Sequence, residues 1–242
     1  MKLTRYEVFS EKISRSYLFV VAADLHNREY KDVVRKIADI KPDAVLVPGD
    51  LCHNLNRPHT HRNSKNGFGF LREAAEIAPT FYSLGNHEKG VTKANYKRVM
   101  QTGAVLLNDR TVSFGEVNIA GLSSGLDDSR LLETPPPDTE FLKVFDKLEG
   151  FKLLLCHHPE YYPRYIENTK IDLTVSGHAH GGQWSFFGRG VFAPGQGLFP
   201  KYTNGIHENR LVISRGLTNT CHPIPRIFNP TELVIIELKP KR

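Results

Sequence analysis

Five short apolar runs each end abruptly in a turn that carries Asp, Asn or His, and this recurrence constrains the fold more than any other feature of the 242-residue chain. The runs cover residues 18–23, 44–47, 81–84, 152–156 and 171–175. Continuous runs of this length are typical of strands that are buried on both faces of a sheet. Apolar residues at helical spacing occupy 28–40, 68–78, 94–102 and 137–148. Strands that alternate with helices predict βαβ units and an α/β fold.

The remaining segments predict shorter β-structure and loops. Residues 105–122 are predicted to form short paired strands that turn at Gly115 and Glu116, and strands are expected at 211–213 and 233–238. No strong helix is expected after Gln183. The predicted loops are 52–67, 125–137 and 181–205. Because no linker composition interrupts the chain, we expect one domain over 1–242.

Composition excludes several classes of protein. Hydrophobic residues make up 40% of the chain and charged residues 24%, which is ordinary for a soluble globular protein. Three distant cysteines do not form a disulfide framework and indicate a reducing compartment. No run approaches the roughly 20 apolar residues that span a bilayer, and no signal peptide is evident. These absences favour a cytoplasmic protein, with contact at the periphery of a membrane left open.

The net charge of +6 is mild. A basic surface favours a phosphate-bearing substrate by electrostatic steering. No block of Lys and Arg stands out, so the charge does not by itself indicate nucleic acid.

The side chains that follow the apolar runs form a candidate metal centre. Ligands of open α/β sheets bind at the carboxyl ends of strands. The residues expected there are Asp24, His26, Asp50, Asn86, His87, His157, His178 and His180. Two carboxylates, one amide and four imidazoles are enough for a site with two metal ions, and these oxygen and nitrogen ligands suit Mn²⁺, Fe or Zn²⁺. His87 is then available for acid–base chemistry.

These residues fall in recognisable blocks. The blocks are Asp24-x-His26, Gly49-Asp50, Gly85-Asn86-His87-Glu88, His157 and Gly177-His178-Ala179-His180. In this order they resemble the signature of the calcineurin-like metallophosphoesterases, and further motifs up to Pro225-Arg226 resemble the bacterial YkuE-like branch of that family. The resemblance implies a four-layer calcineurin-like sandwich, in which two mixed β-sheets pack face to face and are flanked by helices.

The resemblance also implies a role for each residue. Asp24, His26 and His180 would hold one divalent metal ion, and Asn86, His157 and His178 would hold a second. Asp50 would bridge the two ions, and His87 would lie beside them as a catalytic residue. The implied activity is hydrolysis of a phosphate ester, phosphodiester or pyrophosphate bond by attack of a metal-activated hydroxide, with Mn²⁺, Fe²⁺/Fe³⁺ or Zn²⁺ as the ions.

Other interpretations stay open from sequence alone. One is a peripheral hydrolase of a lipid-linked or nucleotide-sugar pyrophosphate instead of a soluble small molecule. Two weaker ones are a non-catalytic calcineurin-like scaffold and a nuclease. The loop 52–67 is either solvated or caps the substrate. The aromatic segment 184–202 either packs its rings on the domain, covers the metals as a flap or contacts a lipid or nucleobase. The substrate and the oligomeric state are not predicted.

Overall fold

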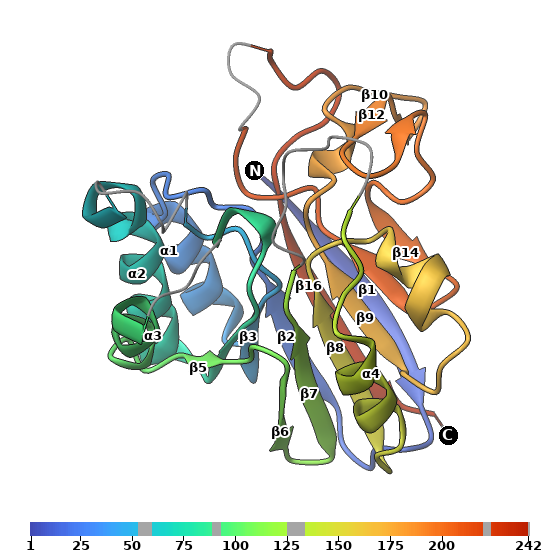
Figure 1. Cartoon of the computed structure of the whole chain (residues 1–242). Coiled ribbons are helices and arrows are strands. Elements are labelled where there is room, and N and C mark those ends of the chain that lie inside the picture. The colour runs from blue at the N-terminus through green and yellow to red at the C-terminus, as the bar shows by residue number, and fades with distance from the viewer. Residues whose placement is uncertain (53–59, 89–92, 125–133, 220–223, 242) are drawn as a thin grey trace.

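The first of two large sheets carries the strands predicted from residues 18–23, 44–47, 81–84 and 233–238. The computed structural model describes residues 1–52, 60–88, 93–124, 134–219 and 224–241. The sheet runs in the order β1 (Lys2–Ser10), β16 (Glu232–Pro240), β2 (Tyr17–Val21), β3 (Ala44–Val47), β4 (Thr80–Tyr82) and β5 (Val105–Leu106). Strands β2 to β5 are parallel, whereas β16 runs antiparallel to β2 and parallel to β1. The carboxyl ends of β2, β3 and β4 therefore point to one edge (Figure 1).

The second sheet is also mixed. Its order is β14 (Gly205–His207), β15 (Leu211–Ile213), β9 (Leu173–Ser176), β8 (Phe151–Cys156), β7 (Val117–Leu122) and β6 (Arg110–Phe114). The four central strands are parallel, and the two outer strands pair antiparallel with their neighbours. The parallel pair β8 and β9 therefore delivers the residues that follow both strands to the same edge.

Alternate residues of the inner strands face two different cores. Phe19 of β2 and Leu46 of β3 belong to the core between the sheets, whereas Val20 and Val45 face the helices. Every residue of β3 and β8 is buried. This double burial explains why the strands read as unbroken apolar runs.

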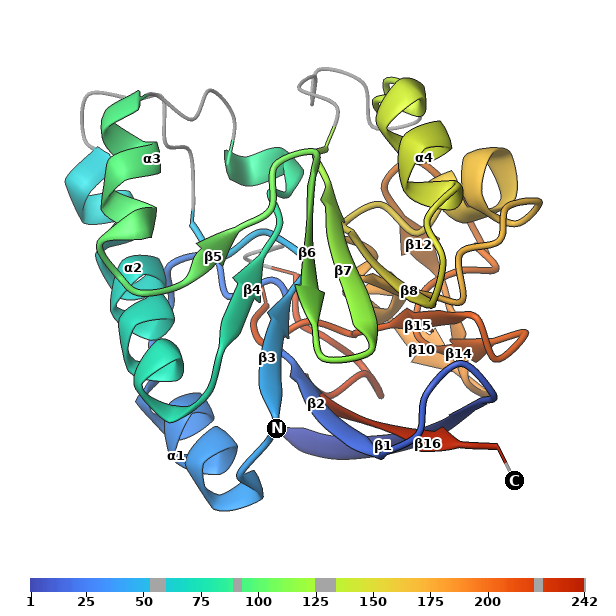
Figure 2. The ribbon, with the colours of Figure 1, turned by 90° about the horizontal axis from the view of Figure 1, so that it is seen from below.

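Helices cover the outer face of each sheet. Helices α1 (Lys31–Ile40), α2 (Thr60–Ile77) and α3 (Lys93–Met100) lie on the first sheet, and α4 (Thr139–Asp146) lies on the second with the π-helical turn η2 (Tyr162–Ile166). Figure 2 shows α1 to α3 on one side of the sandwich and α4 on the other. The predicted four layers are confirmed. No helix among the described residues is long and apolar enough to cross a membrane.

Two predicted loops are partly wrong. Residues 60–67 of the predicted loop 52–67 form the first turns of α2, and 53–59 lie outside the described residues. Polar composition hid this start, which tertiary contacts fix: Asn66 N–H donates to Asn27 Oδ1 at 2.7 Å. Segment 181–205 contains two short hairpins, β10 (Ser185–Phe186) with β11 (Arg189–Gly190) and β12 (Phe192–Ala193) with β13 (Gly197–Leu198). Most of loop 125–137 is outside the described residues.

Candidate metal centre

The carboxyl ends of five strands meet where the two sheets adjoin. Strands β2, β3 and β4 bring Asp24, Asp50 and His87 from one sheet, and β8 and β9 bring His157 and His178 from the other. Backbone hydrogen bonds tie neighbouring ends together, for example from Asp24 N–H to Gly49 O at 3.2 Å and from Gly177 N–H to His157 O at 3.1 Å. The structure thus brings together side chains that are distant in sequence.

Asp50 lies at the middle of this cluster. Its Oδ2 atom is 3.1 Å from His157 Nε2, 3.6 Å from His26 Nε2 and 3.9 Å from His87 Nε2. Its Oδ1 atom accepts a hydrogen bond from the backbone N–H of His87 at 2.9 Å. One carboxylate oxygen therefore fixes the loop after β4, while the other faces three imidazoles.

Asp24 occupies a corresponding position among the imidazoles. Its Oδ1 atom is 3.7 Å from His180 Nε2 and 4.0 Å from the Nε2 atoms of His26 and His157. The same oxygen accepts from the backbone N–H of His178 at 3.1 Å. Asp24 thus links the loop after β2 to the loop after β9.

Two sets of donor atoms are arranged as cation ligands are. The atoms of Asp24, His26 and His180 lie within 4.8 Å of one another, and so do those of Asp50, His157 and His178. Zinc ligands lie about 2.0–2.2 Å from the ion, so two ligand atoms of one ion are less than about 4.4 Å apart. The distances of 3.7 Å from Asp24 to His180 and 3.1 Å from Asp50 to His157 are within this limit. A third such set combines His26, Asp50 and His87. Asn86 lies in the same turn as His87, η1 (Asn86–Glu88).

Hydrogen bonding and burial make these donors suitable for divalent cations. His157 Nδ1–H donates a hydrogen bond to the carbonyl oxygen of Pro48 at 3.2 Å, and the other ring nitrogen, Nε2, faces Asp50. Asp24 Oδ2 is buried without a hydrogen-bond partner among the described residues. Burial is the largest influence that lowers the pKa of His178 and His180 well below its ordinary range, so both imidazoles are neutral. The residues present therefore fit metal ions with nitrogen and oxygen ligands.

The electrostatics of the two carboxylates also favour positive charge. Burial alone would raise the pKa of Asp50, but the nearby imidazoles of His157, His87 and His26 lower it well below its ordinary value. Burial raises the pKa of Asp24 to about 6. Burial would lower the pKa of His157, yet the charge of Asp50 raises it to about 9. The negative charge of Asp50 therefore stabilises positive charge on His157, and it would likewise stabilise a bound metal cation.

The backbone of these loops is in an unusual conformation. Asp24, His26, Asp50, His178 and His180 have φ angles of 56°, 47°, 54°, 66° and 47°. Residues other than glycine adopt this left-handed region infrequently, and such strain gathers at functional sites. The strand ends therefore hold these five side chains in place at a cost in backbone energy.

Glycine permits the close approach of the loops. A Cβ atom on Gly85 would lie 2.1 Å from Asp50 Oδ1, and a Cβ atom on Gly49 would lie 2.6 Å from Gly85 N and 2.8 Å from His157 Nδ1. Gly49 also has a φ of 122°. The glycines before Asp50 and Asn86 are therefore required by space at the centre.

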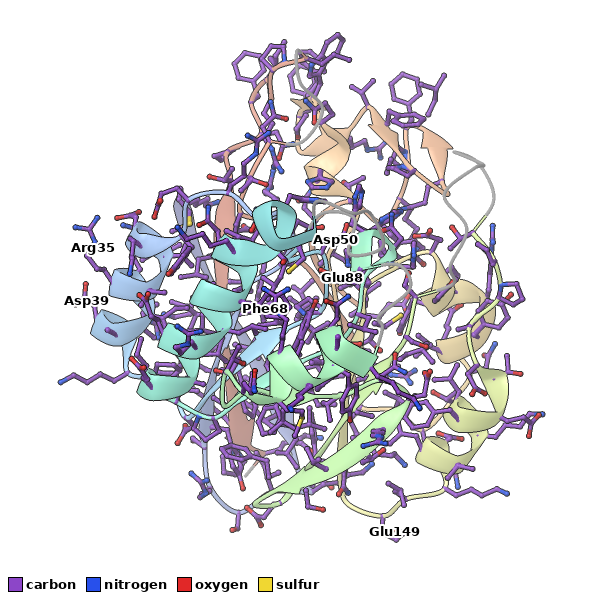
Figure 3. All side chains as sticks on the ribbon, turned by 60° about the vertical axis from the view of Figure 1, so that its left-hand side comes forward. Arg35, Asp39, Asp50, Phe68, Glu88 and Glu149 are labelled. Atoms are coloured by element: carbon purple, nitrogen blue, oxygen red, sulfur yellow. The ribbon has the colours of Figure 1, made fainter. Side chains whose placement is uncertain are left out.

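Glu88 supports the centre from behind. Its buried carboxylate accepts hydrogen bonds from the backbone N–H groups of Asp50, Cys52 and Gly85 at 2.8, 2.8 and 2.7 Å. Burial, followed by the charge of Asp50, raises its pKa to about 7. Figure 3 labels Asp50 and Glu88 close together. Glu88 therefore holds the two strand-end loops by their main chains.

Sequence reasoning missed Glu160. Its buried carboxylate accepts from His158 Nδ1 at 3.1 Å and from Thr134 Oγ1 at 2.5 Å, and its Oε1 lies 3.8 Å from His178 Nε2. The available signal was an acidic residue three positions after His157, on the far side of Pro159. His158, Glu160 and His178 form a further set of clustered donor atoms.

Two arginines of the carboxyl-terminal region have different surroundings. Arg215 lies beside Glu232, with Nε 3.7 Å from Oε1, and donates to Asn204 Oδ1. Arg226 instead lies at the centre, where Nη2 is 3.1 Å from His180 Nδ1. Arg226 is therefore the cation of this region that lies beside the clustered imidazoles.

Burial distinguishes the roles of Cys52 and of the rings in the aromatic segment 184–202. Cys52 is buried, and its Sγ atom packs where a side chain on Gly67 of α2 would stand. The aromatic segment 184–202 divides in two: Tyr202 is buried, whereas Phe187 and Phe199 are exposed. The alternative in which every ring of this segment packs on the domain is therefore wrong.

Comparisons with known proteins agree with this architecture. The calcineurin-like phosphoesterase family model matches residues 17–182. An uncharacterized metallophosphoesterase of Campylobacter jejuni, Cj0846, is 30% identical over 227 residues, which cover 90% of this chain and 56% of that protein. YkuE of Bacillus subtilis, also an uncharacterized metallophosphoesterase, is 27% identical over 241 residues, which cover 92% of this chain and 79% of YkuE.

A solved structure shares the fold. TT1561 of Thermus thermophilus superposes with a TM-score of 0.50 at 15% identity and covers 66% of this chain and 81% of its own. The chain spans little more than half the length of the Campylobacter relative. The family model spans all five sequence blocks that supply the clustered Asp, Asn and His residues. The chain belongs to the calcineurin-like phosphoesterase family.

Proposed function

We propose that the chain is a binuclear metal-dependent phosphohydrolase in which Asp50 bridges two divalent cations. The observation that carries the proposal is the position of Asp50 Oδ2, which faces His26 at 3.6 Å and His157 at 3.1 Å. These two histidines belong to different sets of clustered donor atoms. A carboxylate that faces both sets would be able to hold two ions at the separation of about 3.5–4 Å that two-metal sites have.

The remaining ligands follow from the same grouping. Asp24, His26 and His180 would hold one ion, and His157 and His178 would hold the other. Asn86 would complete the second set, because it adjoins His87, whose backbone N–H is bound by Asp50. Nitrogen and oxygen donors without thiolate suit Mn²⁺, Fe²⁺/Fe³⁺ or Zn²⁺.

His87 is placed for proton transfer instead of ligation in this proposal. Its side chain is 31% exposed, whereas those of Asp24, His26, Asp50 and His157 are buried. Its ring stands edge-on to that of His26, with centroids 4.7 Å apart, and Asp50 fixes its backbone. Bound divalent cations would supply Lewis acidity toward a phosphate oxygen and acidify water. His87 Nε2 would then donate a proton to the leaving oxygen from the solvent side.

The substrate that fits this chemistry is a phosphate ester, phosphodiester or pyrophosphate. The non-catalytic scaffold is disfavoured because no member of either donor set is replaced. A screen of metal-reconstituted protein against aryl monoesters, diesters, cyclic nucleotides and nucleotide sugars tests the proposal. We expect turnover that excess chelator abolishes and Mn²⁺ restores.

Asp50→Asn supplies the critical variant for this screen, and Asp39→Asn, on the exposed face of α1, supplies the matched control (Figure 3). Asp50→Asn should nearly abolish turnover, whereas Asp39→Asn should retain it. Full turnover in excess chelator, or by Asp50→Asn, would refute the proposed function.

A further inference from the structure

Large apolar side chains project into solvent from the segments that follow the metal centre. We call this surface the apolar rim; it comprises Trp184, Phe186, Phe187, Leu198, Phe199 and Phe228. Phe187 is fully exposed, and the exposed fractions of Phe228 and Phe199 are 78% and 75%. Exposed large apolar groups that gather in one place indicate an interaction site.

Two of the segments that form the apolar rim are in contact, and the rim lies at one end of the molecule. The rings of Phe186 and Phe228 are in edge-to-face contact, with centroids 5.9 Å apart. Trp184 Nε1 donates to the carbonyl of Pro225 at 3.0 Å, which joins the same two segments again. Figure 1 shows β10 and β12 at the outermost end of the sandwich, and Figure 3 shows side chains projecting there beyond Asp50.

The backbone holds three of these rings outward at an energetic cost. Phe187, Phe199 and Phe228 each have a φ of 50°. For a bulky residue this left-handed conformation is an outlier. Burial of the rings does not compensate the strain, because all three are exposed. Strain that packing does not explain points to a function for the exposed rings.

Two exposed cations adjoin the apolar rim. Arg189 and Lys201 line a cavity of about 340 Å³ together with Phe199. Lys201 also lies 4.0 Å from Glu208. Aromatic side chains flanked by cations are the combination that binds anionic lipid surfaces.

We propose that the apolar rim docks the protein on an anionic lipid bilayer. Phe187, Leu198 and Phe199 would enter the interface, and Arg189 and Lys201 would contact the lipid phosphates. Phe187 projects from the tip of the β10–β11 hairpin, whereas Leu198 ends β13 and Phe199 follows it. Exposed apolar side chains with cations beside them match the apolar interior and the anionic headgroups of a lipid surface. Because His180 begins the turn that leads into these hairpins, docking would bring the metal centre next to the bilayer.

Co-sedimentation with vesicles tests this inference without reference to catalysis. The metal-loaded full chain should pellet with vesicles of phosphatidylcholine and phosphatidylglycerol, and should bind weakly to phosphatidylcholine alone. The double variant Phe187→Ser/Phe199→Ser should lose at least about tenfold in affinity. Arg189→Gln and Lys201→Gln should each lose about fivefold, and rising salt should reproduce their effect.

Matched controls come from the opposite parts of the surface. Val144→Ser removes a similarly exposed apolar side chain from α4, and Arg35→Gln removes an exposed cation from α1. Both should bind vesicles as the wild type does, and hydrolysis of a minimal aryl phosphate should be unchanged in all rim variants. The inference would be overturned if the rim variants bound vesicles as tightly as the wild type does, or if none of the proteins bound vesicles. So would self-association of the wild type that the rim variants abolish while vesicle binding persists.

Discussion

Gly85→Ala displaces the proposed bridging carboxylate without removing any ligand. The added methyl carbon would lie 2.1 Å from Asp50 Oδ1, whereas non-bonded Cβ contacts below 3.0 Å essentially do not occur. The carboxylate must therefore retreat by about 1 Å. The methyl carbon would also lie 2.6 Å from the backbone N of Asp50, so rotation of the Asp50 side chain alone cannot relieve the overlap.

We expect a large kinetic effect with a modest effect on stability. A misplacement of about 1 Å costs roughly 10²-fold in rate, and overpacking costs about 1–3 kcal/mol of unfolding free energy. The assay measures kcat/KM for an aryl phosphate, bound metal by mass spectrometry and urea unfolding of the same sample. We expect reduced activity and reduced metal content together.

Gly69→Ala provides the matched control. Its methyl carbon would lie 2.5 Å from the hydroxyl of Tyr30, a similar overlap on α2 away from the centre. We expect this variant to keep its metal and its kcat/KM. Wild-type activity and metal content in Gly85→Ala would refute the placement of Asp50.

Three further predictions rest on separate observations. His87→Ala should retain both metals but lose about 10²–10⁴-fold in turnover, less with a nitrophenyl leaving group than with an alkyl one; equal losses on both would contradict proton donation. Glu160→Gln removes the carboxylate beside His158 and His178 and should weaken metal binding about 10–100-fold, as measured by competition with a chelator; unchanged affinity would make Glu160 purely structural. Burial, followed by the charge of Glu232, raises the pKa of Tyr6 to about 12, so the folded state keeps a proton that the unfolded state releases. Unfolding free energy should therefore fall by about 1–2 kcal/mol between about pH 10 and 12, and Tyr6→Phe should remove that part of the loss in urea unfolding.

The sequence predicted the strand-end residues because one pattern carried both fold and chemistry. Strand β3 is apolar throughout since both its faces are covered, and the polar turn after it holds Asp50. The same logic located His157 after β8 and His178 after β9. The apolar runs therefore predicted that these side chains follow strand ends, but they did not predict that the strands belong to two different sheets.

Contacts between distant segments were beyond the reach of such patterns. Strand β1 was not predicted, because an edge strand with Arg5 and Glu7 facing outward has no continuous apolar run. Helix α2 begins in polar sequence that Asn27 anchors from another loop. Glu160 was missed because its partners, Thr134 and His178, are separated from it in the chain.

The central claim is that Asp50 joins two cations, and electron paramagnetic resonance of the Mn²⁺-loaded protein tests it most directly. Two Mn²⁺ ions about 3.5–4 Å apart with a shared carboxylate are magnetically coupled. We expect the wild type to bind two Mn²⁺ per chain and to give the spectrum of a coupled pair, which Asp50→Asn should lose and Asp39→Asn should keep. One Mn²⁺ per chain with an isolated-ion spectrum, or a coupled pair that persists in Asp50→Asn, would contradict the account.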